Sequence, residues 1–264
     1  MYAINRIATL CVVWPVFSLI LTSCTANERT ANVGPLPVDT PPLAPSFFDH
    51  CAFVCVDVQP GGRHVMREDR MPEGWRKAGF TVEDVNAANA YLHDVAKPNA
   101  LRVADGCRRL ELPMIFIHWG YTFRDGMDLA PAIRRSFVAE HGENYDRWPH
   151  HISRPDSKPA DFLGVREGEY VIAKTGQDAF PSSNTEFVLQ NLGVKQIVFV
   201  GGHTGACLGK TAASAKRAGY RILCVADATF DARESSRLPN LEATGYDYVV
   251  TTEEFLGVVA KTDR

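Results

Sequence analysis

The sequence has no marked excess of charge of either sign. Its 28 Lys and Arg residues are offset by 31 Asp and Glu, which leaves a net charge of −3. No strongly basic balance is therefore present that would bind a nucleic acid by releasing counterions. With 45% hydrophobic and 22% charged residues, the composition is also unlike that of a disordered protein. We expect a folded protein with no nucleic-acid partner.

Internal repeats, low-complexity tracts and zinc-type cysteine spacing are missing as well. The 20 Gly and 16 Pro are ordinary numbers for 264 residues, and they follow no period. No CxxC pair occurs, so a structural zinc site is not expected. The length suits a single α/β domain of about 200–250 residues with a sizeable core.

The first residues have the layout of an export signal. Residues 1–6 carry one positive charge, and residues 7–21 form an apolar run that Pro15 interrupts. Such a run is too short for a comfortable transmembrane helix but suits a signal peptide. It leads into Leu-Thr-Ser-Cys at 21–24, which resembles the lipobox of bacterial lipoproteins. The resemblance implies cleavage after residue 23 and a lipid on Cys24.

This signal predicts where the protein resides and where its domain begins. Residues 24–46 are rich in Pro, Thr, Asn and Ala without periodic apolar spacing, which is typical of a disordered tether. The folded domain is predicted over 47–264. We expect it in the cell envelope, on the periplasmic side, with the lipid anchor as its membrane contact.

An odd number of cysteines falls within the predicted domain. At least one thiol therefore stays free even if the others pair. Several lie in apolar runs, where Cys commonly behaves as a small buried hydrophobe. The residues are Cys51, Cys55, Cys107, Cys207 and Cys224, and the sequence leaves open whether any disulfide forms among those other than Cys207.

Short apolar runs alternate with helical segments along the domain. Strands are expected at 51–57, 114–118, 170–173, 196–200, 221–226 and 246–250, with helices at 81–97, 184–192, 208–217 and 253–260. This alternation predicts a doubly wound, mostly parallel six-stranded sheet with helices on both faces, a Rossmann-like three-layer α/β sandwich. The polar stretch 120–168 is long for a passive connection and is expected to act as a lid or binding loop.

Three reactive side chains follow the predicted strands. In doubly wound sheets the chemistry lies beyond the carboxyl ends of the strands, where Asp57, Lys174 and Cys207 stand. Cys207 directly precedes the helix predicted at 208–217, so the helix dipole and a nearby lysine would favour its thiolate. Asp57 could take the thiol proton and deliver it to a leaving amine. The purely structural alternative is that Asp57 and Lys174 form an ion pair and that the Cys207 thiol packs in the core.

At these residues the sequence resembles a known family, the isochorismatase-like cysteine hydrolases. The family includes nicotinamidases, N-carbamoylsarcosine amidohydrolases and ureidoacrylate hydrolases. The resemblance covers most of residues 50–260 and is carried by VCVDVQ, VIAKTGQDAF, GGHTGACLGKTAASA and GYRILCVADAT. Around Cys207 the family segment matches at Gly201, Thr204, Cys207, Leu208, Thr211, Ala212 and Ala215.

The resemblance implies a chemistry for these residues. It implies a catalytic triad of Cys207, Lys174 and Asp57, and a cis peptide between Gly202 and His203. The amides of His203 and Cys207 would form an oxyanion hole. The implied reaction is hydrolysis of a C–N bond in a small amide, carbamoyl or ureido substrate through a Cys207 thioester, without a cofactor. Family members also form dimers or tetramers, so a homo-oligomer is expected.

The sequence departs from the family pattern at the pocket entrance. Gln59 precedes Pro-Gly-Gly where relatives often continue Asn-Asp-Phe. The Asp-x-His metal pair of nicotinamidases is replaced by IHWGYTFRDG, so no catalytic metal is expected. His118 is either a substrate contact or a structural histidine. The remaining candidate substrate contacts are Gln59, Trp119, Tyr121 and Phe180, of which the three aromatic residues would equally suit the core.

Two other interpretations compete with the hydrolase. The Gly-Lys-Thr at 209–211 follows a strand as in a P-loop, but Thr204 occupies the place of the first Walker glycine. A non-catalytic envelope binding module on the same fold is the second alternative, which the intact set of three reactive residues argues against. The loop histidines His141, His150 and His151 are expected to be solvated, with contact to the substrate or to a neighbouring subunit as the alternative.

Overall fold

The computed structural model describes residues 36 and 40–262 of the chain. The predicted signal peptide, Cys24 and most of the predicted tether lie outside these residues. Among the helices described, none is long and apolar enough to cross a membrane.

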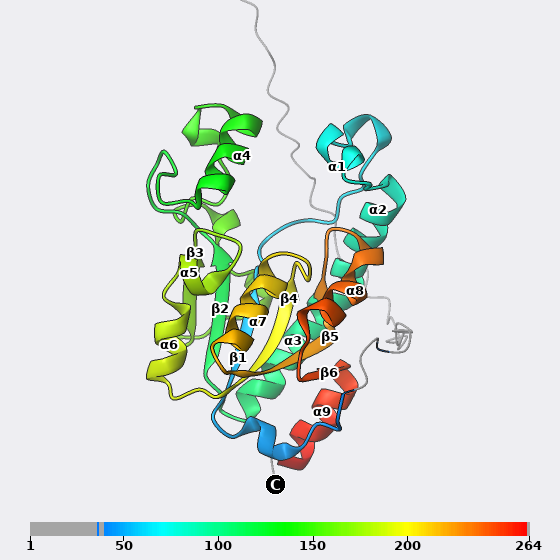
Figure 1. Ribbon diagram of the computed structural model, residues 1–264, viewed down its shortest axis with the longest axis vertical. Helices are drawn as coiled ribbons and strands as arrows, with labels where there is room; N and C mark the ends of the chain where they lie inside the picture. Colours follow the sequence, from blue (N-terminus) through cyan, green and yellow to red (C-terminus); the bar gives the residue numbers. More distant parts are fainter. Residues whose placement is uncertain (1–35, 37–39, 263–264) are drawn as a thin grey trace, which may run out of the picture. The chain divides into compact units, whose positions relative to one another are not determined.

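A parallel sheet forms the centre of the domain (Figure 1). Its six strands lie in the order β3-β2-β1-β4-β5-β6, and each neighbouring pair is parallel. This confirms the predicted doubly wound sheet. The strands are β1 (Cys51–Val56), β2 (Met114–Trp119), β3 (Tyr170–Lys174), β4 (Gln196–Gly202), β5 (Arg221–Phe230) and β6 (Tyr248–Val250).

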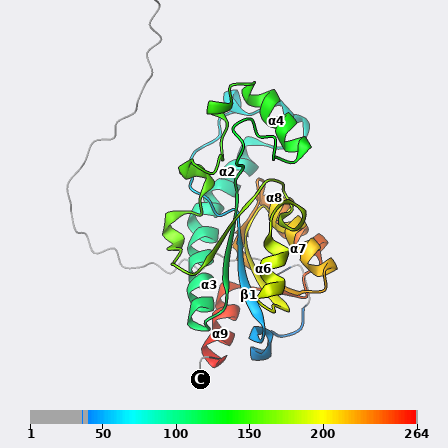
Figure 2. The same ribbon diagram turned by 90° about the vertical axis from the view of Figure 1, so that its left-hand side faces the viewer.

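Helices cover both faces of the sheet, as Figure 2 shows edge-on. The α-helices are α1 (Glu73–Lys77), α2 (Val82–Tyr91), α3 (Lys97–Arg109), α4 (Pro131–His141), α5 (Ala179–Ser182), α6 (Thr185–Asn191), α7 (Cys207–Arg217), α8 (Glu234–Thr244) and α9 (Thr252–Thr262). Short helical turns are η1 (Pro45–Phe48), η2 (Glu68–Arg70), the π-helical η3 (Leu92–Ala96), η4 (Tyr145–Arg147), η5 (Pro155–Ser157) and η6 (Asp161–Leu163).

The apolar runs of the strands divide between two cores. Successive side chains of a strand point to opposite faces of a sheet. In β1, Phe53 and Cys55 therefore pack with α3 and α9, whereas Val54 and Val56 pack with α6, α7 and α8. Burial on both faces explains why these strands are continuous apolar runs rather than alternating ones.

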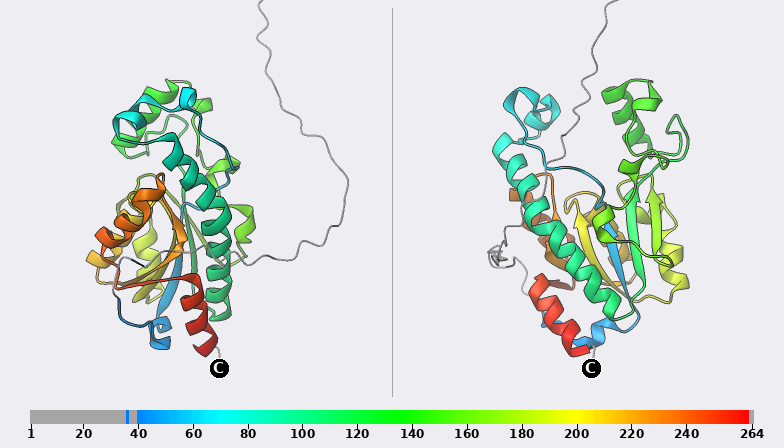
Figure 3. Two further views of the ribbon diagram at one scale, coloured as in Figure 1. Left: turned by 90° about the vertical axis from the view of Figure 1, so that its right-hand side faces the viewer. Right: turned by 180° about the vertical axis from the view of Figure 1, so that it is seen from behind.

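One long helical segment crosses the first of these faces (Figure 3). The sequence predicts a helix that ends before Pro98, but α2, η3 and α3 follow one another without a break from residue 82 to residue 109. A proline clashes with the carbonyl four residues earlier in a regular α-helix. Here the preceding turn is π-helical, with the Lys97 amide donating to Leu92. This wider turn accommodates Pro98, so the predicted end of the helix was wrong.

The domain begins earlier than predicted. Thr40 hydrogen-bonds to the backbone of Val249, and Leu43 packs against the core next to the buried Phe47 and Phe48. These contacts place the boundary near residue 40 instead of residue 47, because the apolar side chains among the prolines find a partner surface on the domain.

The long stretch 120–168 has a small core of its own. Tyr121, Leu129 and Trp148 are buried together, with Phe137 of α4 packed against them. The Trp148 ring donates a 2.9 Å hydrogen bond to the Gly142 carbonyl. This segment is therefore a packed subdomain above the sheet rather than an open loop.

The junction of β4 with β1 requires a glycine. Gly201 has a φ of 104°, and a Cβ at this position would collide with the carbonyl oxygen of Val56. The register between β4 and β5 also shifts between Phe199 and Gly201. The close approach of the two backbones leads β4 directly into the turn that precedes α7.

We expect Gly201→Ala to lower the free energy of unfolding by about 3 kcal/mol, because alanine combines an unfavourable φ with this backbone collision. Gly74→Ala is the matched control, since nothing lies near a Cβ there, and it should leave stability unchanged or raise it by up to about 1 kcal/mol, because Gly74 lies in helix α1. Urea denaturation measures both variants. If Gly201→Ala were as stable as Gly74→Ala, β1 and β4 would have to be able to move apart.

Candidate active site

The site lies where the strand order reverses. The chain adds β2 and β3 on one side of β1 and then places β4 on the other side. At such a switch point the connections diverge and leave a crevice beyond the carboxyl ends of the strands. Asp57 directly follows β1, Lys174 ends β3 and Cys207 begins α7 after β4. The topology therefore delivers the three predicted residues to one edge of the sheet.

Lys174 is fully buried and is held by several partners. Its Nζ lies 2.8 Å from Oδ2 of Asp57 and donates to the Gly176 carbonyl at 3.2 Å. It also lies 3.9 Å from the centre of the Trp119 ring, which is its register neighbour on β2. A buried ammonium requires such compensation for lost hydration. Lys174 thus passes beside Trp119 to reach Asp57 across β2.

Cys207 meets this ion pair from the other side. Its side chain is only 4% exposed, and the charges of both Asp57 and Lys174 act on it. Burial and the Asp57 carboxylate raise the pKa of the Cys207 thiol to about 12, and the weaker effect of Lys174 in lowering the pKa does not offset them. The expectation of a resting thiolate is therefore corrected. The thiol keeps its proton next to a carboxylate that can accept it.

Two backbone amides beside the thiol have no acceptor among the described residues. The peptide between Gly202 and His203 is cis, as the resemblance implied. In the following turn the Thr204 amide donates to Phe230 at 3.0 Å and the Gly205 amide donates to the Asp231 carboxylate at 2.7 Å. By contrast, the amides of His203 and Cys207 donate to no acceptor within the part of the chain that the structure describes. They remain available to an oxyanion.

Gln59 fixes two segments of the site and has little capacity left for a substrate. Its Oε1 accepts from the Trp119 amide at 2.9 Å, and its Nε2 donates to the carbonyls of Asp156 at 2.7 Å and Trp119 at 3.4 Å. The predicted substrate contact is thus a positioning residue that joins the end of β2 to η5.

Of the other candidate contacts, only Trp119 lines the pocket. His118 is buried, its Nδ1 lies 3.0 Å from the Trp119 carbonyl, and burial lowers its pKa, so it is a structural histidine. Tyr121 is 1% exposed within the small core of residues 120–168. Phe180 packs against Tyr220 in the core beside α7. Trp119 lines the pocket and His118 does not because neighbouring side chains along β2 point to opposite faces of the sheet.

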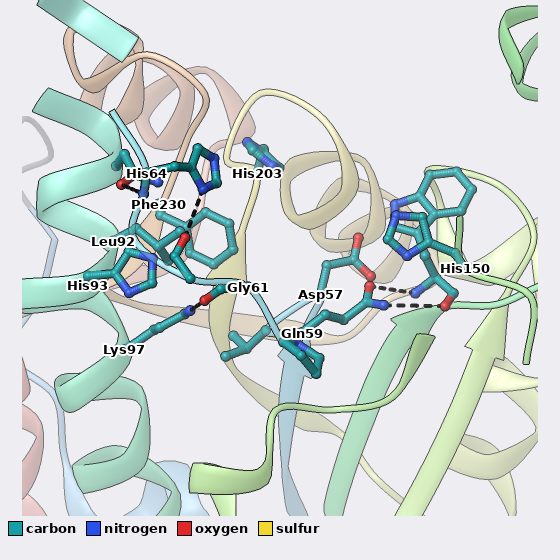
Figure 4. A pocket seen from close by; sticks show the side chains of 15 residues that line it. Asp57, Gln59, Gly61, His64, Leu92, His93, Lys97, His150, His203 and Phe230 are labelled. Carbon is teal, nitrogen blue, oxygen red and sulfur yellow. Dashed lines mark hydrogen bonds between the residues drawn. The ribbon is translucent and has the colours of Figure 1, made fainter. Parts of the chain in front are cut away.

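A pocket of about 300 Å³ opens beside Asp57 (Figure 4). Its lining includes His150, which the sequence analysis treated as a solvated loop residue, and the side chain of His203. Helical residues that sequence reasoning missed complete it: Asn89, Leu92, His93 and Lys97, together with His64 from the preceding loop and Phe230 at the end of β5. The spacing of the four helical residues is the signal that could have indicated a common face.

The P-loop alternative does not fit the geometry. Gly209 lies inside α7, where a Cβ would collide with the Thr204 carbonyl, and Lys210 bonds to Gln177. No phosphate-cradling loop is formed by these residues. In the described ranges, no three His, Cys, Asp or Glu side chains group in a way that could hold a metal ion.

Comparison with known proteins agrees with this architecture. The sequence profile of the isochorismatase domain matches residues 51–254. The chain belongs to the isochorismatase family. An uncharacterized isochorismatase family protein of Bacillus subtilis (strain 168), YwoC, is 27% identical over 162 residues, which cover 60% of this chain and 80% of the relative.

Solved structures of the family share the fold. An isochorismatase family protein from Burkholderia thailandensis has a TM-score of 0.57 at 22% identity, over 84% of this chain and all of its own. A cysteine hydrolase from Pseudomonas syringae pv. phaseolicola 1448A has a TM-score of 0.60 at 15% identity, and the match covers 87% of this chain and 99% of that structure. N-carbamoylsarcosine amidase from Thermoplasma acidophilum has a TM-score of 0.52 at 21% identity, and the match covers 77% of this chain and 96% of that structure. The fold is thus that of isochorismatase-family hydrolases.

The raised pKa of Cys207 predicts an alkaline profile for its alkylation. Iodoacetamide attacks the thiolate, so its rate at Cys207 should still be rising at about pH 10. Asp57→Asn removes a charge that raises this pKa, and at about pH 8 we expect roughly tenfold faster alkylation than in the unmodified protein. Lys174→Met should shift the profile to higher pH. Mass spectrometry of the Cys207 peptide measures each rate.

A plateau below about pH 8 in the unmodified protein would contradict a neutral resting thiol. Slower alkylation of Asp57→Asn would contradict the assigned effect of the carboxylate. The reaction at Cys224, which is fully buried, serves as an internal reference for intact folding in every variant.

Proposed function

We propose that this protein is a cysteine hydrolase that cleaves the C–N bond of a small amide, carbamoyl or ureido compound through a Cys207 thioester. The observation that carries the proposal is the convergence of the Cys207 thiol on the buried Asp57–Lys174 pair, beside a pocket that Asp57 lines. A nucleophile, a proton acceptor and a cation in contact are the elements that acyl transfer requires.

The first half of the reaction forms the thioester. As Sγ of Cys207 attacks the carbonyl carbon, its proton passes to the Asp57 carboxylate, so no free thiolate has to exist in the resting site. The carbonyl becomes an oxyanion that accepts from the unpaired amides of His203 and Cys207. When the C–N bond breaks, Asp57 returns the proton to the departing nitrogen.

The second half releases the acid product. A water molecule gives a proton to Asp57 and attacks the thioester carbonyl, and the C–S bond breaks as the tetrahedral intermediate collapses. The proton then returns to Sγ and the thiol is restored. Lys174 takes no part in these proton transfers; it forms an ion pair with the Asp57 carboxylate and lowers the pKa of Cys207.

The relatives support this reaction class. One neighbouring structure is described as a cysteine hydrolase and another as N-carbamoylsarcosine amidase, which acts on a carbamoyl compound. No observation on the described residues favours the non-catalytic binding module. We further propose that the enzyme works as a lipid-anchored homo-oligomer in the cell envelope. The resemblance of residues 21–24 to a lipobox and the dimers or tetramers formed by family members support this proposal.

We expect Cys207→Ala to abolish ammonia release from every active member of a panel of amides. The panel contains nicotinamide, an N-carbamoyl amino acid, a ureido acid and succinamate, because these span the proposed C–N bonds. Acid quenching of the unmodified protein during turnover should also trap an acyl group on the Cys207 peptide, detected by mass spectrometry.

Cys107→Ala is the matched control, since Cys107 is a buried thiol on α3 in the other core, and it should retain activity. Ammonia release by Cys207→Ala at the rate of the unmodified protein would remove the nucleophile and with it the proposed mechanism.

A further inference from the structure

The pocket beside Asp57 has an uncompensated positive charge. Asp57 is the only carboxylate that lines it in the described part of the chain, and its charge is balanced by Lys174. Lys97 also lines the pocket, donates at 3.1 Å to the Gly61 carbonyl, and forms no ion pair with any described residue. The lining therefore carries a lysine without a counterion, together with the imidazoles of His64, His93, His150 and His203.

The π-helical turn places two of these groups on one face. Asn89, His93 and Lys97 are spaced four residues apart, and all three line the pocket. Residues at this spacing lie next to one another on a helix surface. Figure 4 shows His93 and Lys97 together on the side of the pocket opposite His150, with Asp57 between the two sides. The helix thus builds a basic end that is separate from the reactive end.

Positive charges act on one another at this end of the pocket. Burial lowers the pKa of His93, and the positive charges of Lys97, Arg63 and His64 lower it further. The nearby acid, Asp94, is engaged by Arg63 in an exposed ion pair. Burial also lowers the pKa of Lys97. A bound anion would raise the pKa values of both His93 and Lys97, because an opposite charge favours their protonated forms.

We propose that the substrate carries a carboxylate, which binds at Lys97 and His93 while the scissile C–N bond lies at Cys207. The inference rests on the proposed function for the position of the reacting bond. A pocket of about 300 Å³ has room for one small molecule that extends from Lys97 to Asp57, the member of the reactive set that lines it. Lys97 acts as a point charge that selects acidic amides over neutral ones, and Asn89 keeps an amide group free to donate because its Oδ1 already accepts from the His64 amide.

Alkylation by two reagents of nearly equal size tests the preference without turnover. Iodoacetate and iodoacetamide transfer similar groups to a thiol, and only iodoacetate is an anion. The ratio of the iodoacetate rate to the iodoacetamide rate at Cys207 does not depend on the thiolate fraction, because both reagents react with the same thiolate. We expect this ratio to exceed that of N-acetylcysteine, and Lys97→Met to lower it by about three- to fivefold while the iodoacetamide rate is unchanged.

Two further variants make the result specific. Lys97→Arg keeps the charge and should keep the ratio near that of the unmodified protein. Lys195→Met removes an exposed lysine just before β4, at the opposite edge of the sheet, and should leave the ratio unchanged. An equal ratio in Lys97→Met and in the unmodified protein overturns the inference. Absence of Cys207 labelling by either reagent also overturns it, since the pocket would then not open onto the thiol.

The outcomes separate this inference from the proposed function. If Cys207 is labelled without any charge preference, the carboxylate site is refuted and the hydrolase stands. If Cys207→Ala still releases ammonia, the thioester mechanism is refuted, whereas the dependence of the ratio on Lys97 continues to report an anion site.

Discussion

The buried ion pair of Lys174 and Asp57 is the constraint on which the site depends. A lysine with no exposed surface loses its hydration, and only close compensation makes that burial tolerable. The Asp57 carboxylate, the Gly176 carbonyl and the Trp119 ring supply the compensation. These partners come from β1, β2 and the segment after β3, so the ends of three strands are tied to one ammonium. The Cys207 thiol can contact the pair only because this arrangement is held in place.

In the proposed mechanism, different layers of the fold carry out the reaction and the recognition of the substrate. The sheet edge and the turn before α7 carry the thiol, the ion pair and the two unpaired amides. The continuous helix from α2 to α3 carries the basic end of the pocket, through His93 and Lys97. Substitutions on the helix face can therefore change which substrate is accepted without altering the sheet edge. Gln59 links the end of β2 to η5 and so fixes these two segments of the site relative to each other.

Most of the central sheet could be predicted because its strands are buried on both faces and therefore appear as apolar runs bounded by polar residues. The predictions failed where a tertiary contact overrides a local signal. Pro98 normally marks a helix end, but a π-helical turn accommodates it. The aromatic residues of 120–168 lack a strand or helix period, because Tyr121, Phe137 and Trp148 are brought together from three separate segments to form a small core.

The sequence by itself determined the family, the order of the strands along the chain and the identity of Asp57, Lys174 and Cys207, because local apolar patterning and short motifs specify these. Only the tertiary structure decided the protonation of Cys207, since its pKa depends on burial and on charges that are distant along the chain. The same holds for the pocket. Nothing in the sequence marks His93 and Lys97 as site residues, and they share a cavity with His150 because the crossover connections bring their segments together at the edge of one sheet.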